Sequence, residues 1–415
     1  MDDLWRKRAV GAATALVVVF LVLLAGDSLS GGRVIGLQAN GADQGDEAET
    51  DDPAAVLEVT GTTLGSVAQA PDDDDGAGAE AAPDPAGPQG DTLTYEAIRN
   101  EQDKFGRFTE VPSAQLDLSA LTEPAPVNEN GASPEGQFRA ACEYSHFGAD
   151  DPIIFPGQPG AAHLHMFFGN TETNAFTTTE ELIDSGGGTC SGFELNRSAY
   201  WVPALLDGQG NAIVPDQIIL YYKTKFPESV SPMPQGLQML AGNFESESFE
   251  ADQFLHWSCG PNGNSYNSTN RIPDCGGDII NASIVFPNCW DGVNLGSDDF
   301  VSHLTYADDQ TPCPGSHPVR MPKISILIYW PGVDSVDGWH LSSDDTGGFN
   351  GPPGGTLHAD WWGAWNDDTM DLWIEGCMQA SRNCSYGQTG TSRQLAGLNP
   401  TETYEGENFL PLPDP

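Results

Sequence analysis

Two histidines separated by a single residue are the most chemically suggestive feature of this 415-residue sequence. His163 and His165 lie in a short run, residues 163–168, that is rich in apolar residues and is predicted to form a β-strand. Side chains two residues apart on a strand point to the same face, so the two imidazoles would lie side by side. Imidazole nitrogens are common ligands of transition metals. The pair therefore predicts part of a metal site or, alternatively, two histidines that only hydrogen-bond neighbouring loops.

Two later histidines are candidates for the same site. His303 follows a serine, and His358 precedes Asp360 by two residues in a segment rich in aromatic residues. We expect the four histidines to converge around one cleft, with Asp360 close by. The predicted metal ligands are His163, His165, His303 and His358. Three imidazoles with an open position suit zinc or copper, whereas a site dominated by carboxylates would favour calcium or manganese.

Two aspartates are candidates for catalysis. Asp360 and Asp291 could each coordinate a cation, act as a general base or hold an imidazole in the correct tautomer. Asp291 precedes a glycine, a common turn pair, and for this residue the turn interpretation is favoured. The chain has no Gly-x-Ser-x-Gly motif and no nucleotide-binding or phosphate-binding loop, so serine hydrolase, NAD and ATP chemistry have no support in the sequence.

The composition limits the partners. The chain has 60 acidic and 16 basic residues and a formal net charge of −44. Electrostatic repulsion argues against binding to nucleic acid or to an anionic membrane surface. We therefore expect contact with a membrane only through the N-terminal segment.

The N-terminus indicates export. Three basic residues at positions 6–8 precede an apolar run over residues 9–26, a pattern typical of an export signal. The run reaches the lower limit for a membrane span and is followed by a poor cleavage site, so we expect residues 1–26 to be an uncleaved anchor with the remainder outside. A cleaved signal peptide, which would give a secreted protein, is the alternative.

The eight cysteines are expected to form four disulfides, because the compartment outside the cytoplasmic membrane is oxidising. Eight cysteines permit about 105 pairings, so the connectivity does not follow from the sequence alone. Pairing of sequence neighbours is our working hypothesis: Cys142 with Cys190, Cys259 with Cys275, Cys289 with Cys313, and Cys377 with Cys384.

The remaining composition predicts a single folded domain with flanking segments. Short β-type runs are separated by Gly, Pro, Asn and Asp, which favours an all-β sandwich or jelly-roll-like domain with long, disulfide-tied loops. The predicted strands cover 153–155, 163–168, 199–202, 218–222, 279–286 and 324–330, and one helical pattern covers 365–378. The predicted segments are an anchor helix over 1–26, a disordered acidic stalk over 27–91, an extended arm over 92–135, the domain over 136–386 and a tail over 387–415.

Several motifs together resemble DUF1996, a secreted family of unassigned function found in bacteria and fungi. The resemblance covers about residues 138–384 and is carried by these segments: 151–157, 163–165 with 168–170, 198–205, 236–242, 286–292, 313–314 and 358–360. One departure is that Gly296 and Phe300 stand where the family pattern has polar residues. The resemblance implies no reaction.

Two functions remain open from the sequence. The first is a metal-dependent enzyme acting on extracellular polysaccharide. The second is a non-catalytic glycan-binding or envelope module, in which histidines and aromatic residues shape a groove. Trp361 and Trp362 are adjacent in a predicted strand region, so we expect at least one of them to face outward, where a sugar could stack.

Overall fold

The computed structural model describes residues 116, 119, 122–125, 135–244, 249, 251–260, 268–397 and 408–412. All of these belong to one unit that spans residues 82–415. The predicted anchor, the acidic stalk and most of the predicted arm lie outside the described residues. Among the helices that are described, none is long and apolar enough to cross a membrane.

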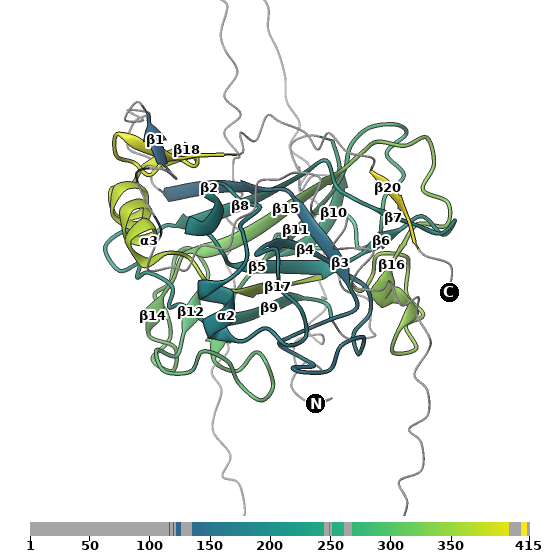
Figure 1. Ribbon diagram of the computed structural model, residues 1–415, viewed down its shortest axis with the longest axis horizontal. Helices are drawn as coiled ribbons and strands as arrows, with labels where there is room; N and C mark the ends of the chain where they lie inside the picture. Colours follow the sequence, from purple (N-terminus) through teal and green to yellow (C-terminus); the bar gives the residue numbers. More distant parts are fainter. Residues whose placement is uncertain are drawn as a thin grey trace, which may run out of the picture. The chain divides into compact units, whose positions relative to one another are not determined.

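Most strands belong to two large sheets (Figure 1). The six-stranded sheet has the order β10 (Leu255–Cys259), β11 (Ile280–Val285), β15 (Lys323–Trp330), β8 (Gln217–Thr224), β2 (Gly136–Cys142) and β18 (Asn383–Tyr386). The five-stranded sheet has the order β3 (Tyr144–Gly148), β4 (His165–Gly169), β5 (Ala199–Pro203), β17 (His358–Trp362) and β9 (Gln238–Gly242). Neighbouring strands are antiparallel except for β18 and β2. The prediction of a mainly β fold is confirmed.

Smaller elements complete the described part of the chain. There are three further sheets among the described residues. The first pairs β1 (Thr122–Pro124) with β19 (Arg393–Leu395), and the second has the order β13 (Leu304–Thr305), β12 (Cys289–Trp290) and β14 (Val319–Arg320). The third has the order β16 (His340–Leu341), β6 (Leu205–Leu206), β7 (Asn211–Ile213) and β20 (Phe409–Pro411). The helices are α2 (Thr179–Asp184) and α3 (Asp367–Trp373), which continues into the π-helical turn η6 (Ile374–Gln379), together with the short 3-10 helices η3 (Phe193–Leu195) and η5 (Ser342–Asp345). The predicted helix over 365–378 is confirmed by α3 and η6.

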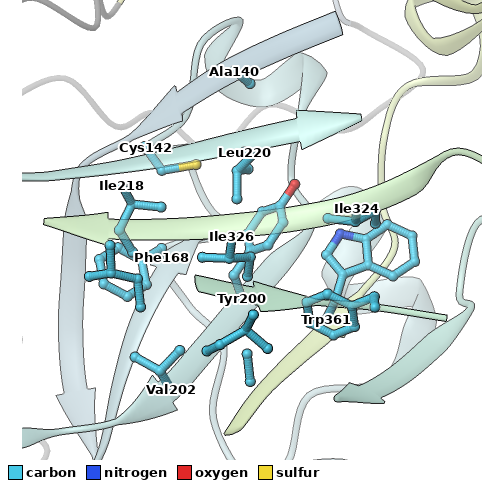
Figure 2. Packing of buried hydrophobic residues seen from close by; sticks show 14 of the residues in the cluster. Ala140, Cys142, Phe168, Tyr200, Val202, Ile218, Leu220, Ile324, Ile326 and Trp361 are labelled. Atoms are coloured by element: carbon cyan, nitrogen blue, oxygen red, sulfur yellow. The ribbon is translucent and has the colours of Figure 1, made fainter. Parts of the chain in front are cut away.

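The two large sheets share one hydrophobic core. Because side chains alternate along a strand, every second residue faces the other sheet. Leu220 and Ile326 of the six-stranded sheet and Phe168 and Tyr200 of the five-stranded sheet are fully buried in this core (Figure 2). The Tyr200 hydroxyl also meets the Tyr222 hydroxyl of β8 at 2.7 Å, so a buried hydrogen bond joins the sheets.

The opposite face of the five-stranded sheet is covered by loops. Phe167 of β4 and Trp201 of β5 pack there against Ile153 from the preceding loop and Leu182 from α2, forming a second, smaller cluster. This sheet is therefore buried on both faces. Its outer face also carries the polar side chains of His165, His358 and Asp360.

One predicted strand is wrong. Residues 153–155 form a turn, because the Asp151 side chain accepts hydrogen bonds from the backbone N–H groups of Ile153 and Ile154, at 2.9 and 2.8 Å. The Phe155 N–H also donates to the Asp151 carbonyl oxygen, at 2.8 Å. Aspartate before a tight turn commonly satisfies the backbone in this way, and here it overrides the β-propensity of the apolar residues.

All four predicted disulfides are confirmed: Cys142–Cys190, Cys259–Cys275, Cys289–Cys313 and Cys377–Cys384. Cys142–Cys190 ties the end of β2, in the six-stranded sheet, to the loop after α2. That loop pairs with the end of β4 through a bridge between Asn170 and Gly188. The bond therefore ties the end of β2 to a loop that lies beside the residue following β4.

Candidate metal centre

Two of the histidines reach each other across the central strand of the five-stranded sheet. His165 of β4 pairs with Pro203 of β5, and Asp360 of β17 pairs with Trp201 of β5. Because β17 and β5 are antiparallel, the residue two before Asp360 lies opposite the residue two after Trp201. His358 therefore flanks Pro203 on the side opposite His165. Proline has no long side chain to separate its neighbours, and the two imidazole centroids are 6.0 Å apart.

His163 completes a cluster of three imidazoles. It lies just before β4, and its ring centroid is 4.1 Å from that of His165 and 5.1 Å from that of His358. One ring nitrogen from each of the three side chains lies within 4.8 Å of the other two. His165 and His358 are buried, whereas His163 is half-buried.

Backbone carbonyls orient two of these rings. The Nδ1 atom of His165 lies 2.9 Å from the Asp150 carbonyl oxygen, and Nδ1 of His358 lies 2.7 Å from that of Thr356. A carbonyl only accepts, so each Nδ1 carries the hydrogen and each neutral ring presents an unprotonated Nε2. This is the arrangement by which metal-ligating histidines are usually held.

The imidazoles are kept neutral. Burial lowers the pKa of His165 to about 3 and that of His358 to about 4, and it holds the pKa of His163 well below its usual value. The Nε2 atoms of His163 and His165 are buried and have no hydrogen-bond partner in the described part of the chain. Buried polar atoms normally have a partner, and these two lone pairs are available to a ligand.

Two carboxylates adjoin the imidazoles. Asp360 lies on the same face of β17 as His358, and its ligand atom, together with those of His165 and Asp151, forms a second group within 4.8 Å. Asp360 is fully buried, and neither carboxylate oxygen has a hydrogen-bond partner among the described residues. Burial and the nearby Asp151 raise the pKa of Asp360 well above its usual value, and burial raises that of Asp151 to about 6.

His303 lies away from this cluster. Its Nε2 donates to the Gln238 carbonyl oxygen at 2.7 Å, and its Nδ1 lies 2.8 Å from the Ser297 hydroxyl. Gln238 pairs with Trp362, at the opposite end of β17 from His358. Trp362 and His358 are four residues apart on β17, a distance of about 13 Å along the strand, and His303 lies at the Trp362 end. The structure therefore brings together three of the four histidines that the sequence singled out.

Asp291 is part of a turn. It is half-buried, and its Oδ1 accepts the backbone N–H groups of Val293 and Asn294, at 2.8 and 2.9 Å. Asp151, by contrast, joins the cluster although the sequence did not single it out as a site residue. The signal that could have identified it is its place at the head of the segment 151–157, one of the motifs that carry the family resemblance.

The expectation that Trp361 or Trp362 faces outward is wrong. Trp361 is fully buried in the core between the sheets, and Trp362 is 4% exposed in the smaller cluster beneath α2. They do face opposite sides of β17, but both sides of this sheet are covered. Neither side chain offers a surface on which a sugar could stack.

Comparison with known proteins places these residues within one family. The family model described as a domain of unknown function, DUF1996, matches residues 151–365, more than half of the chain. The chain belongs to the DUF1996 family. All five clustered residues, from Asp151 to Asp360, lie within the matched stretch. No curated protein and no solved structure matches the chain.

Four histidines with lowered pKa values predict that the metal-free protein loses stability in acid. The folded-state pKa values of His146, His163, His165 and His358 lie below 6.5, so these histidines stabilise the fold above that pH, and this contribution is lost as the pH falls towards about 4. Asp151 acts in the opposite sense, because its raised pKa stabilises the fold below about 6. We expect the four histidines to outweigh Asp151 and Asp360, whose raised pKa values act in the opposite sense.

Thermal unfolding in the presence of a chelator, measured between pH 7 and pH 4, checks this prediction. We expect the free energy of unfolding to fall by several kcal/mol over this range, since one pKa unit corresponds to about 1.4 kcal/mol. A midpoint temperature of unfolding that stays constant or rises as the pH falls towards 4 would contradict the prediction.

Proposed function

We propose that the DUF1996 domain of this chain is an extracytoplasmic metalloprotein domain that holds one zinc or copper ion on His163, His165 and His358. The observation that carries this proposal is the convergence of three neutral imidazoles, two of them oriented through Nδ1 by backbone carbonyls. Nitrogen ligands suit these borderline cations. The four disulfides support a location in an oxidising compartment.

We further propose that the domain is a metal-dependent enzyme acting on extracellular polysaccharide. Three protein ligands, the number typical of catalytic zinc sites, would leave a coordination position of the ion for water or substrate. A bound ion would act as a Lewis acid and lower the pKa of water there. Asp360 lies beside His165 and would accept the proton.

A non-catalytic glycan-binding module is the second candidate, and a separate cavity favours it. A cavity of about 400 Å³ lies between the loop after β8 and α3. Trp290, which is half-buried, lines it together with Met233 and Met370, and Asp367 and Asp371 lie at the same cavity. An aromatic ring with nearby carboxylates is suited to stacking on a sugar and accepting its hydroxyl hydrogens.

Metal content tests the metal site directly. The full chain, purified without chelator and loaded with zinc or copper, is expected to hold one equivalent by elemental analysis. His358→Ala is expected to weaken binding by roughly 100-fold or more, whereas His340→Ala, in a histidine outside the cluster, should leave it unchanged. A wild-type chain that retains no stoichiometric zinc or copper would exclude the proposal.

Activity separates the two candidates. If the domain is an enzyme, soluble fragments should be released from an extracellular polysaccharide only by the metal-loaded wild-type chain. If it is a binding module, no fragments appear and Trp290→Ala abolishes retention on the polysaccharide, while His358→Ala does not.

A further inference from the structure

We infer that Asp151, His165 and Asp360 form a second, oxygen-rich cation position that overlaps the three-histidine position through the shared imidazole of His165. The centre then holds one ion at a time, and the chemical hardness of the ion decides which set of ligands it uses. The inference goes beyond the proposed zinc or copper site because it concerns different ligands and a different class of metal.

The carboxylate of Asp360 is the first argument. Asp360 is 0% exposed, and neither of its oxygens has a partner in the described part of the chain. A buried carboxylate without hydrogen bonds is expensive, and such groups are normally paired or bound to a cation. A cation bound beside Asp360 would supply the missing partner.

The surroundings of Asp360 are suited to a cation. Asp151 is 4% exposed and contributes a second carboxylate, while His165 contributes an Nε2 atom that is also buried and has no partner among the described residues. The three ligand atoms lie within 4.8 Å of one another. The two backbone N–H groups that donate to Oδ1 of Asp151 fix its carboxylate at the start of the turn.

Charge balance favours a divalent ion. Two ionised carboxylates around a divalent cation give a group with no net charge, and burial penalises such a group far less than an isolated ion. Two oxygen donors and one imidazole suit manganese or iron(II), whereas the three imidazoles suit zinc or copper.

The two positions exclude each other because His165 has only one nitrogen to offer. Its Nδ1 donates to the Asp150 carbonyl, which leaves Nε2 as the single ligand atom for both groups. An ion on the three imidazoles therefore removes the imidazole from the carboxylate set. Zinc should displace manganese from the wild-type chain.

Two sets of variants separate the positions. Asp360→Asn keeps the size of the side chain and removes its charge, and Asp151→Asn keeps an oxygen that can accept the backbone N–H groups. Each is expected to weaken Mn²⁺ binding by roughly 100-fold or more and to change zinc affinity by no more than a few-fold. The double variant His163→Ala/His358→Ala is expected to weaken zinc binding by roughly 100-fold or more and to change Mn²⁺ affinity by no more than a few-fold.

Electron paramagnetic resonance of Mn²⁺ added to the full chain, with zinc as competitor, provides the measurement, and circular dichroism establishes that each variant is folded. Loss of the bound-Mn²⁺ signal in either aspartate variant, together with its retention in the double histidine variant, supports the inference. A wild-type chain that binds no Mn²⁺, aspartate variants that bind it normally, or simultaneous binding of one Mn²⁺ and one Zn²⁺ would each overturn it. The proposed zinc or copper site fails separately, if the wild-type chain binds no zinc or copper.

Discussion

His165→Ala is expected to abolish high-affinity binding of both zinc and manganese. His165 is the one residue common to the two groups of candidate ligands, so its removal leaves two ligands in each. Loss of a ligand should lower each affinity by at least about 100-fold, since even the outer partners of metal ligands typically contribute 10- to 100-fold. Isothermal titration calorimetry of each metal with the variant chain measures the effect.

His146→Ala is the matched control for this substitution. His146 is a buried histidine on the neighbouring strand β3, where its ring stacks on Phe167 at 4.6 Å and its Nε2 donates to the Thr173 carbonyl at 2.8 Å. Replacing His146 by Ala removes the same side chain as His165→Ala. His146, however, belongs to neither group of candidate ligands. Retained metal in His165→Ala, or lost metal in a folded His146→Ala, would count against the role assigned to His165.

Among the four disulfides, removal of Cys142–Cys190, which closes the longest loop, is expected to lower the free energy of unfolding most. Cys142 and Cys190 are separated by 48 residues, and a cross-link over a loop of this length stabilises a fold by about 4 kcal/mol in the chain-entropy model. The double variant Cys142→Ser/Cys190→Ser should therefore lower the free energy of unfolding by that amount. Denaturant titration under oxidising conditions measures it.

The Cys377–Cys384 bond provides an internal comparison. It closes a loop of only seven residues at the end of α3 and η6, for which the same model gives about 2 kcal/mol. Cys377→Ser/Cys384→Ser should thus cost roughly half as much. An equal or greater loss from the shorter loop would show that local packing, rather than chain entropy, determines the contribution of these bonds.

The strands were predictable where one physical signal dominated. In β15, residues 324–330 are rich in β-branched and aromatic residues, and the strand spans Lys323–Trp330. Residues 153–155 have the same apolar character but form a turn, because the side chain of Asp151 competes for their backbone N–H groups. Local propensity cannot reveal this competition unless the aspartate is considered together with the residues that follow it.

The candidate site was predictable where it depended on strand alternation. His163 and His165 lie side by side, as a His-x-His pair on extended chain should. The approach of His358 depends on the pairing of β17 with β5, and the position of His303 depends on its bond to Gln238. Both contacts join distant parts of the chain, so they cannot be predicted from the residues that surround each histidine in the sequence.

The sequence separation of the ligands has a consequence for metal supply. His163 and His165 precede His358 by almost two hundred residues, and the three meet only after β4 and β17 have joined opposite edges of β5. The same folded unit contains disulfides, which form in oxidising surroundings. Under the proposed function, a chain that folds there would acquire its ion there, so the occupant would be selected from the metals present in that oxidising compartment. Copper, which binds nitrogen sites more tightly than zinc does, would then prevail wherever both are present in comparable amounts.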